Sequence, residues 1–127
     1  MRTDLDTNAR QVSLPIAAVC AIAATALAVA MGIGRFAFTP LLPLMVRDGS
    51  LTAGAGAWLA ASNYLGYLVG AVTAARLGLS PPVLMRASLA GIVVTTAAMG
   101  ALDGAAVWTG LRFAAGAFSA WALVAVS

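Results

Sequence analysis

The sequence predicts an all-α fold, a polytopic membrane bundle of about four transmembrane helices. Of the 127 residues, 62% are hydrophobic and only 9% are charged, whereas soluble domains carry about 25% charged residues. Apolar segments recur along the chain, and each reaches the length of about 20 residues that crosses a hydrocarbon core of roughly 30 Å. No segment alternates apolar and polar residues as a barrel strand does, so helices must satisfy the backbone in lipid.

Polar or turn-forming residues separate four expected spans. They cover about residues 14–45, 54–75, 83–102 and 105–127, and together form one transmembrane domain, residues 14–127, behind an N-terminal tail, residues 1–13. The separators are "VRDGS" (46–50), "RLGLSPP" (76–82) and "DG" (103–104). The first span is longer than a perpendicular crossing needs, so we expect it to be tilted, broken or protruding.

Loop arginines set the expected orientation. Arg2, Arg10, Arg76 and Arg86 lie on one side of the bundle, and Arg47 alone lies on the other. The positive-inside rule therefore places the N-terminus in the cytoplasm. Abundant Ala, Gly and Arg without any Lys is typical of a GC-rich bacterial genome, so the expected location is a bacterial inner membrane.

Several function classes are disfavoured by composition. The seven arginines are scattered rather than clustered, which argues against binding to nucleic acid. The chain has no His and a single cysteine, Cys20, so we expect neither an internal disulfide nor a metal site. Without a His, a Cys pair or an acid inside a span, we expect no enzyme and no cofactor.

Two arginines do not lie in loops. Arg35 is inside the first span, and Arg112 lies well inside the fourth. An arginine at the centre of a membrane helix costs roughly 2.5–3.5 kcal/mol on insertion scales. With alternating spans, both lie at similar depth in the outer half of the membrane. All four acids lie in the tail or in loops. Each arginine therefore needs water, a carbonyl, a carboxylate from elsewhere or an anionic ligand, or else it extends to the outer interface.

Two prolines follow Arg35 in the same span. As helix breakers, Pro40 and Pro43 would free the carbonyls of Phe36 and Thr39. In a continuous α-helix Thr39 would share the face of Arg35, four residues before it. A charge, a hydroxyl and freed carbonyls are typical of the interrupted helix of a transporter, although a proline kink for packing alone is the alternative.

The second span carries small residues every four positions, Ser62, Gly66 and Gly70. Such a ridge lets another helix backbone approach closely. Asn63 and Tyr67 form a polar stripe beside it, which either lines a cavity or makes hydrogen bonds between helices. Trp58 and Trp108 lie near the outer ends of their spans, where tryptophan is typical of interfacial anchors.

Three segments resemble the major facilitator superfamily, and specifically its YbfB/YjiJ-type branch. They are "MGIGRFAFTPLLPLM" (31–45), "WLAASNYLGYLVGA" (58–71) and "LRFAAGAFSA" (111–120). In the last, Arg112 and Gly116 are similar to the superfamily's fourth-helix motif. In the loop after the second span, Arg76 and Gly78 match the superfamily's conformational loop, but Ala75 stands where the acid would be.

The resemblance implies a secondary transporter that moves a small solute by alternating access, with the arginines favouring an anion and with proton coupling as an option. Such transporters have about twelve helices, so we expect an N-terminal fragment, truncated within helix four, that does not transport alone. Its expected partners are the lipid bilayer, the solute and the missing helices. Helices one and four line the cavity in the superfamily. The candidate cavity residues are Arg35, Thr39, Asn63, Tyr67 and Arg112.

Two alternatives stay open. One is a small four-helix exporter, which would depend on a carboxylate within the membrane, and no span contains one. The other is a non-transporting membrane subunit held by the ridge of small residues.

Overall fold

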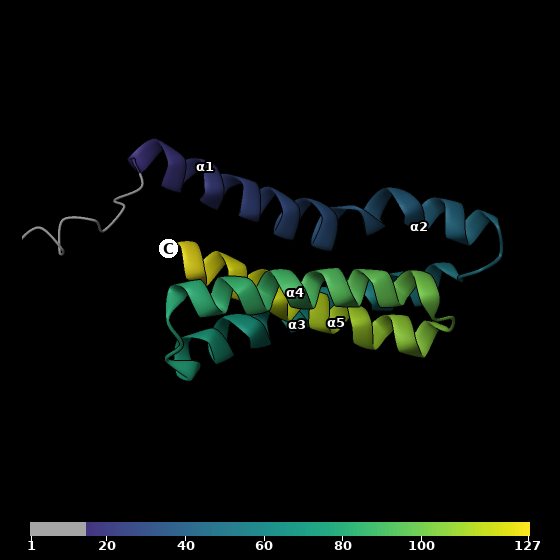
Figure 1. The fold of residues 1–127 in the computed structure, drawn as a ribbon. Coiled ribbons are helices and arrows are strands. Elements are labelled where there is room, and N and C mark those ends of the chain that lie inside the picture. Colours follow the sequence, from purple (N-terminus) through teal and green to yellow (C-terminus); the bar gives the residue numbers. More distant parts are fainter. Residues whose placement is uncertain (1–14) are drawn as a thin grey trace, which may run out of the picture.

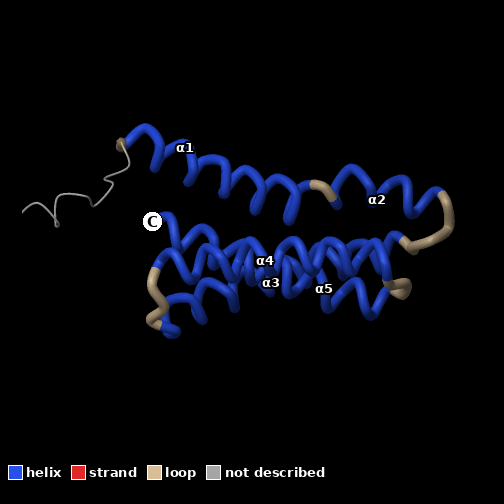
Figure 2. Tube along the Cα trace, viewed as in Figure 1, coloured by secondary structure: helices blue, strands red, loops and turns tan. Residues whose placement is uncertain are grey.

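The computed structural model describes residues 15–127, apart from the side chains of residues 34 and 35. The expected tail, residues 1–13, lies outside the described residues. The described chain is helical throughout and joined by short loops (Figure 2), which confirms the predicted fold class. The segments are α1 (Ile16–Leu27), η2 (Ala28–Phe36), α2 (Phe38–Arg47), α3 (Ala53–Leu77), α4 (Pro81–Ala101) and α5 (Ala105–Val126).

Helices α3, α4 and α5 form a bundle, and the first segment, α1 to α2, runs along one side of it (Figure 1). Helix α5 is the centre of this arrangement, because it contacts α3 and α4 extensively and also α1 and η2. The α3–α5 contact is the most extensive in the molecule. Helix α5 therefore carries the residues that connect the first segment to the bundle.

The first segment changes its helical geometry twice. Residues Ala28–Phe36 form a π-helix, and the N–H of Ala37 donates to the carbonyl of Gly32, five residues back, at 3.1 Å. The α-helix resumes at Phe38, so Pro40 falls in the first turn of α2 and only Pro43 lies inside that helix. A proline in a first turn removes no intrahelical hydrogen bond.

This geometry corrects one step of the sequence reasoning. The expectation that Thr39 shares the face of Arg35 used the spacing of a continuous α-helix. Because a π-helix closes its hydrogen bonds over five residues instead of four, and because Ala37 interrupts the helical run, that spacing does not apply here.

The limits of the later helices follow from their sequence. The Thr52 hydroxyl accepts a hydrogen bond from the N–H of Ala55 at 3.2 Å and so caps the start of α3. Helix α3 ends at Gly78, whose φ of 58° is left-handed and favours glycine. Pro81 and Pro82 occupy the first turn of α4, where proline is accommodated.

Three segments are long and apolar enough to cross a membrane: Ile16–Arg47, Pro81–Ala101 and Ala105–Val126. Helix α3 is not among them, although it has 25 residues and was expected to be a span. The physical reason is its content of Asn63, two tyrosines and several glycines. These residues lower its apolarity, and three of them, Asn63, Gly66 and Gly70, contact α5.

Helix α3 meets α5 through glycines on both helices. Gly66 and Gly70 are buried, and a Cβ on either would collide with the α5 backbone, at Phe113 and Ala117 respectively. From the opposite side, a Cβ on Gly116 would collide with the backbone carbonyl of Asn63. The two backbones are therefore in direct contact, as small-residue faces permit in membrane helices.

We expect Gly116→Ala to lower the free energy of unfolding by about 1–3 kcal/mol, because the added methyl must force apart two packed backbones. Gly110→Ala is the matched control, since it lies on the same helix with nothing within 4 Å of its Cβ. That substitution should be neutral or stabilise by up to about 1 kcal/mol. Unfolding by SDS in mixed micelles, followed by circular dichroism, measures both. Equal effects would contradict the packing described.

Candidate functional site

Arg112 is a charged residue that is buried in the described structure. It lies on α5 and exposes only 5% of its surface. Its backbone carbonyl accepts a hydrogen bond from the Asn63 side-chain amide of α3 at 2.8 Å. Its guanidinium carbon lies 4.7 Å from the centre of the Phe38 ring of α2. Three helices that are distant in sequence thus meet at this residue.

The glycine contact explains why Asn63 reaches Arg112. Gly116 lies one turn after Arg112 on α5, and its missing side chain leaves room for the backbone of Asn63. A short amide side chain can then bridge to the neighbouring helix. Asn63 is 3% exposed, so this hydrogen bond forms away from solvent and satisfies a buried polar group.

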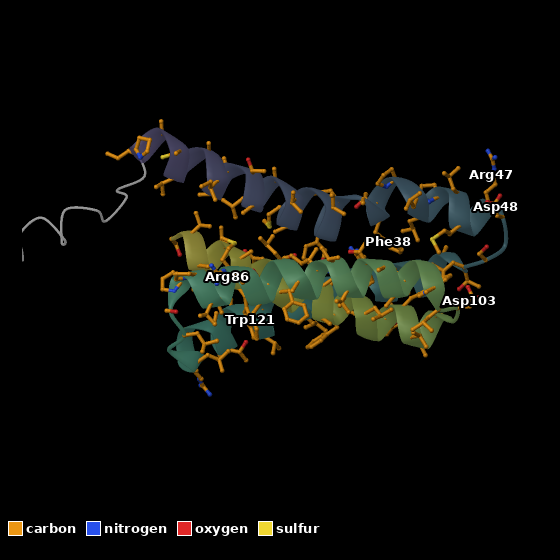
Figure 3. All side chains as sticks on the ribbon, in the orientation of Figure 1. Phe38, Arg47, Asp48, Arg86, Asp103 and Trp121 are labelled. Carbon is orange, nitrogen blue, oxygen red and sulfur yellow. The ribbon has the colours of Figure 1, made fainter. Side chains whose placement is uncertain are left out.

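The ring of Phe38 lies against the guanidinium of Arg112. It is 7% exposed and packs in a cluster with Leu51 and Leu59. An arginine over an aromatic face gains about 0.5–1 kcal/mol at exposed sites and about 2 kcal/mol or more when desolvated. Figure 3 shows Phe38 between the first segment and the bundle, where the cluster holds the ring in place.

Two pockets share Arg112 and Phe38. The first has a volume of about 300 Å³ and lies between α2, α4 and α5. The second has about 50 Å³ and lies between α2, α3 and α5. Because Arg112 and Phe38 line both pockets, the two pockets lie next to each other at this pair of residues. The first is mostly apolar, and its further lining residues include Ile33, Leu41, Met45, Thr96, Met99 and Trp108.

Another pocket, of about 580 Å³, lies between α1 and α4. Its lining residues are apolar except for Thr25, whose hydroxyl donates to the carbonyl of Ala21 in the same helix. With no charge among the described residues that line it, this pocket offers no group to orient a solute. The pockets at Arg112 are therefore the candidate site.

The structure brings together three of the five candidate cavity residues. Thr39, Asn63 and Arg112 all line the pocket of about 50 Å³. Tyr67 is half-buried on α3 and is not among the lining residues of either pocket at Arg112. The side chain of Arg35 lies outside the described residues, so its predicted role stays a prediction.

Two further residues line these pockets, although the sequence reasoning proposed neither of them as a cavity residue. Tyr64, next to Asn63, lines the smaller pocket, and the four-residue spacing gave no signal for it. Trp108, which was expected to be an interfacial anchor, lines the pocket of about 300 Å³ at Arg112. Its indole N–H donates to the carbonyl of Leu102 at 2.6 Å. Trp58, by contrast, is 71% exposed.

The proposed conformational loop lies at the far end of the bundle. Arg76 is exposed in the last turn of α3, just before Gly78. Figure 3 shows Arg86 at one end of the bundle and Arg47, Asp48 and Asp103 at the opposite end. Among the charged side chains that the structure describes, those outside the candidate site thus gather at the two ends of the helices.

A second polar link joins α5 to the π-helix. The Ser119 hydroxyl lies 3.3 Å from the carbonyl of Ala30 and 2.9 Å from that of Ala115. Ser119 is fully buried. Since η2 leads directly to Phe38, this link helps to fix the start of α2 relative to Arg112.

We expect Asn63→Leu to lower the free energy of unfolding by about 0.6–1.7 kcal/mol, the range for hydrogen bonds between membrane helices. The substitution keeps a branched side chain with the same number of heavy atoms but removes the donor to Arg112. Ser62→Ala is the control, because the Ser62 hydroxyl bonds only the carbonyl of Leu59 in its own helix. SDS titration should show a larger loss for Asn63→Leu. A loss confined to Ser62→Ala would contradict this assignment.

Comparison with known proteins gives one match. The chain matches the family described as "Uncharacterised MFS-type transporter YbfB" over residues 27–127. The matched range contains all of η2 to α5 and every residue that lines the pockets at Arg112. Comparison with curated proteins and with solved structures gives no significant match.

Proposed function

Since the chain belongs to the YbfB-type family of major facilitator transporters, we propose that it serves the secondary active transport of a small anionic solute by alternating access. The observation that carries this proposal is the burial of Arg112 between two pockets. A cation at membrane depth marks a solute or ion pathway by default.

Placing the charge of Arg112 at membrane depth is costly. A guanidinium held among apolar side chains would be replaced by a smaller apolar residue if packing were its only purpose. Arg112 instead lines accessible volume on two sides. An anionic group entering either pocket would meet a charge in a low-dielectric surrounding, where electrostatic attraction is stronger than in water.

Alternating access requires elements that can move relative to one another. Helices α3 and α5 are locked by direct backbone contact. The first segment is less firmly held, because it contains a π-helix and two prolines and has pockets along its contact with α4 and α5. We infer that the first segment moves against a rigid α3–α5 unit. Lipid and further helices of the transporter would cover its exposed apolar side chains.

We further propose an inner-membrane location with the α1 start and the α3–α4 loop in the cytoplasm. The opposite end, at Asp48 and Asp103, would face outward. Arg76 and Arg86 near the α3–α4 loop support this orientation.

Single cysteines test the orientation in intact cells. In a Cys20→Ser background, Ser50→Cys at the α2–α3 loop should react with a membrane-impermeant maleimide. Leu79→Cys at the α3–α4 loop should react only after the cells are permeabilised. Both positions are exposed, so burial does not limit either reaction. The reverse labelling pattern would overturn the orientation.

Removal of the charge tests transport itself. In proteoliposomes with a full-length family member that carries these helices, we measure uptake of labelled benzoate, lactate and phosphate. Arg112→Gln should reduce uptake of the transported anion by more than about tenfold, as expected when more than about 1.4 kcal/mol of interaction is lost. Arg86→Gln, an exposed charge on α4, should leave it close to the parent level. Unchanged uptake with Arg112→Gln would remove the role proposed for this arginine.

A further inference from the structure

We propose that the pocket of about 300 Å³ between α2, α4 and α5 selects amphipathic monoanions, meaning a single carboxylate on an aliphatic or aromatic body. This inference rests on the proposed function, because it names the solute class of the same site. It follows from the number of charges in the pocket, the character of its walls and the geometry of Arg112 with Phe38.

The number of charges favours a monoanion. Arg112 is the ionisable residue among the described lining residues of this pocket, and Thr96 adds one hydroxyl. The N–H of Trp108 is already bonded to the Leu102 carbonyl, so Trp108 offers its ring rather than a donor. A phosphate or dicarboxylate would bury a second charge against apolar walls, which is costly without a partner.

The walls favour an apolar body on that anion. Ile33, Leu41, Met45 and Met99 present aliphatic or thioether surface, and the rings of Phe38 and Trp108 complete the lining. Methionine side chains adapt to ligands of varied shape. The volume is at the lower end of the range for small-molecule pockets, about 300–1,000 Å³, so the solute is small.

Phe38 contacts Arg112 through the face of its ring, whereas a carboxylate would bind through the guanidinium N–H groups. The ring lies over the guanidinium, 4.7 Å from its central carbon. A carboxylate is bound by the N–H groups along the edge of the guanidinium plane, often by two parallel hydrogen bonds. Phe38 therefore acts as a positioning residue, because contact with its ring limits where the guanidinium can lie, and an anion would bind through the guanidinium N–H groups.

The experiment measures binding to the chain itself in lipid nanodiscs. Trp58→Phe and Trp121→Phe leave Trp108 as the single fluorescent reporter inside the pocket. The probes are acetate, butyrate, hexanoate, benzoate and inorganic phosphate. 1-Hexanol is the control for partition into lipid, because it has the same apolar body without a charge.

We expect affinity to rise about fourfold for each added CH₂, the effect of burying one methylene group. Benzoate should bind, whereas phosphate and 1-hexanol should not change Trp108 fluorescence specifically. Arg112→Gln should abolish the carboxylate response, and Arg86→Gln should retain it. Phe38→Leu keeps an apolar side chain but removes the ring, so it should weaken hexanoate binding several-fold.

The following results would overturn the inference. A series that is flat from acetate to hexanoate, or a preference for phosphate that still depends on Arg112, would reject the amphipathic class while leaving anion transport intact. A response that is equal for hexanoate and 1-hexanol would reject a charged ligand in this pocket, and the separate uptake assay would then decide the transport proposal.

If circular dichroism shows that the Arg112→Gln variant does not fold, Arg112→Lys replaces it. Lysine keeps the charge without the planar edge, so hexanoate should bind less tightly, and unaltered affinity would contradict the inference.

Discussion

The direct contact between the backbones of α3 and α5 is the constraint on which the rest of the structure depends. Gly66, Gly70 and Gly116 remove the side chains that would hold the two helices apart. In lipid, apolar side chains gain little from leaving their surroundings, so close van der Waals contact and interhelical hydrogen bonds provide the association. This contact brings Asn63 to the carbonyl of Arg112 and thereby fixes the part of α5 that carries the charge.

Around this fixed pair, the remaining elements are held by smaller contacts. Helix α4 packs on α5 partly where the Phe118 ring lies against Gly91. The first segment is joined to α5 by the Ser119 hydroxyl and by the Phe38 ring. The molecule thus combines a rigid pair of helices with a less tightly bound segment, and the candidate site lies at the boundary between them.

The fold class was predictable because it depends on composition and segment length, which no local detail can alter. The spacing of Ser62, Gly66 and Gly70 was also informative, because residues four apart lie on one helix face, and all three are buried in the structure. Arg112 was conspicuous as a charge inside an apolar segment. Its aromatic neighbour was not predictable, because Phe38 follows a π-helix. The direction of every later side chain depends on the number of residues per turn, and the sequence gives no clear sign of the wider turn.

Similar reasoning explains the other differences. Tyr67 was chosen over Tyr64 because it stands four residues from Asn63, yet a pocket formed by three helices can be lined by adjacent residues of one of them. Trp108 was expected at the membrane interface from its place near a helix end, and this stays a prediction. That it also lines the pocket between α2, α4 and α5 is a result of the tertiary fold, which the sequence of α5 alone could not indicate.

The π-helix has a consequence for how this chain tolerates changes in length. A π-helical turn holds a surplus residue relative to an α-helical one. A one-residue deletion within residues 28–36 could therefore be absorbed as an ordinary α-helix, while each residue of an α-helix contributes a rotation of about 100°. The segment would remain helical and apolar, and α2 would keep nearly the same side toward the bundle. A deletion within the α-helical residues 16–27 has no surplus residue to remove, so it would rotate one end of the segment relative to the other. The nine residues of η2 are therefore the part of the segment where the loss of one residue is best tolerated.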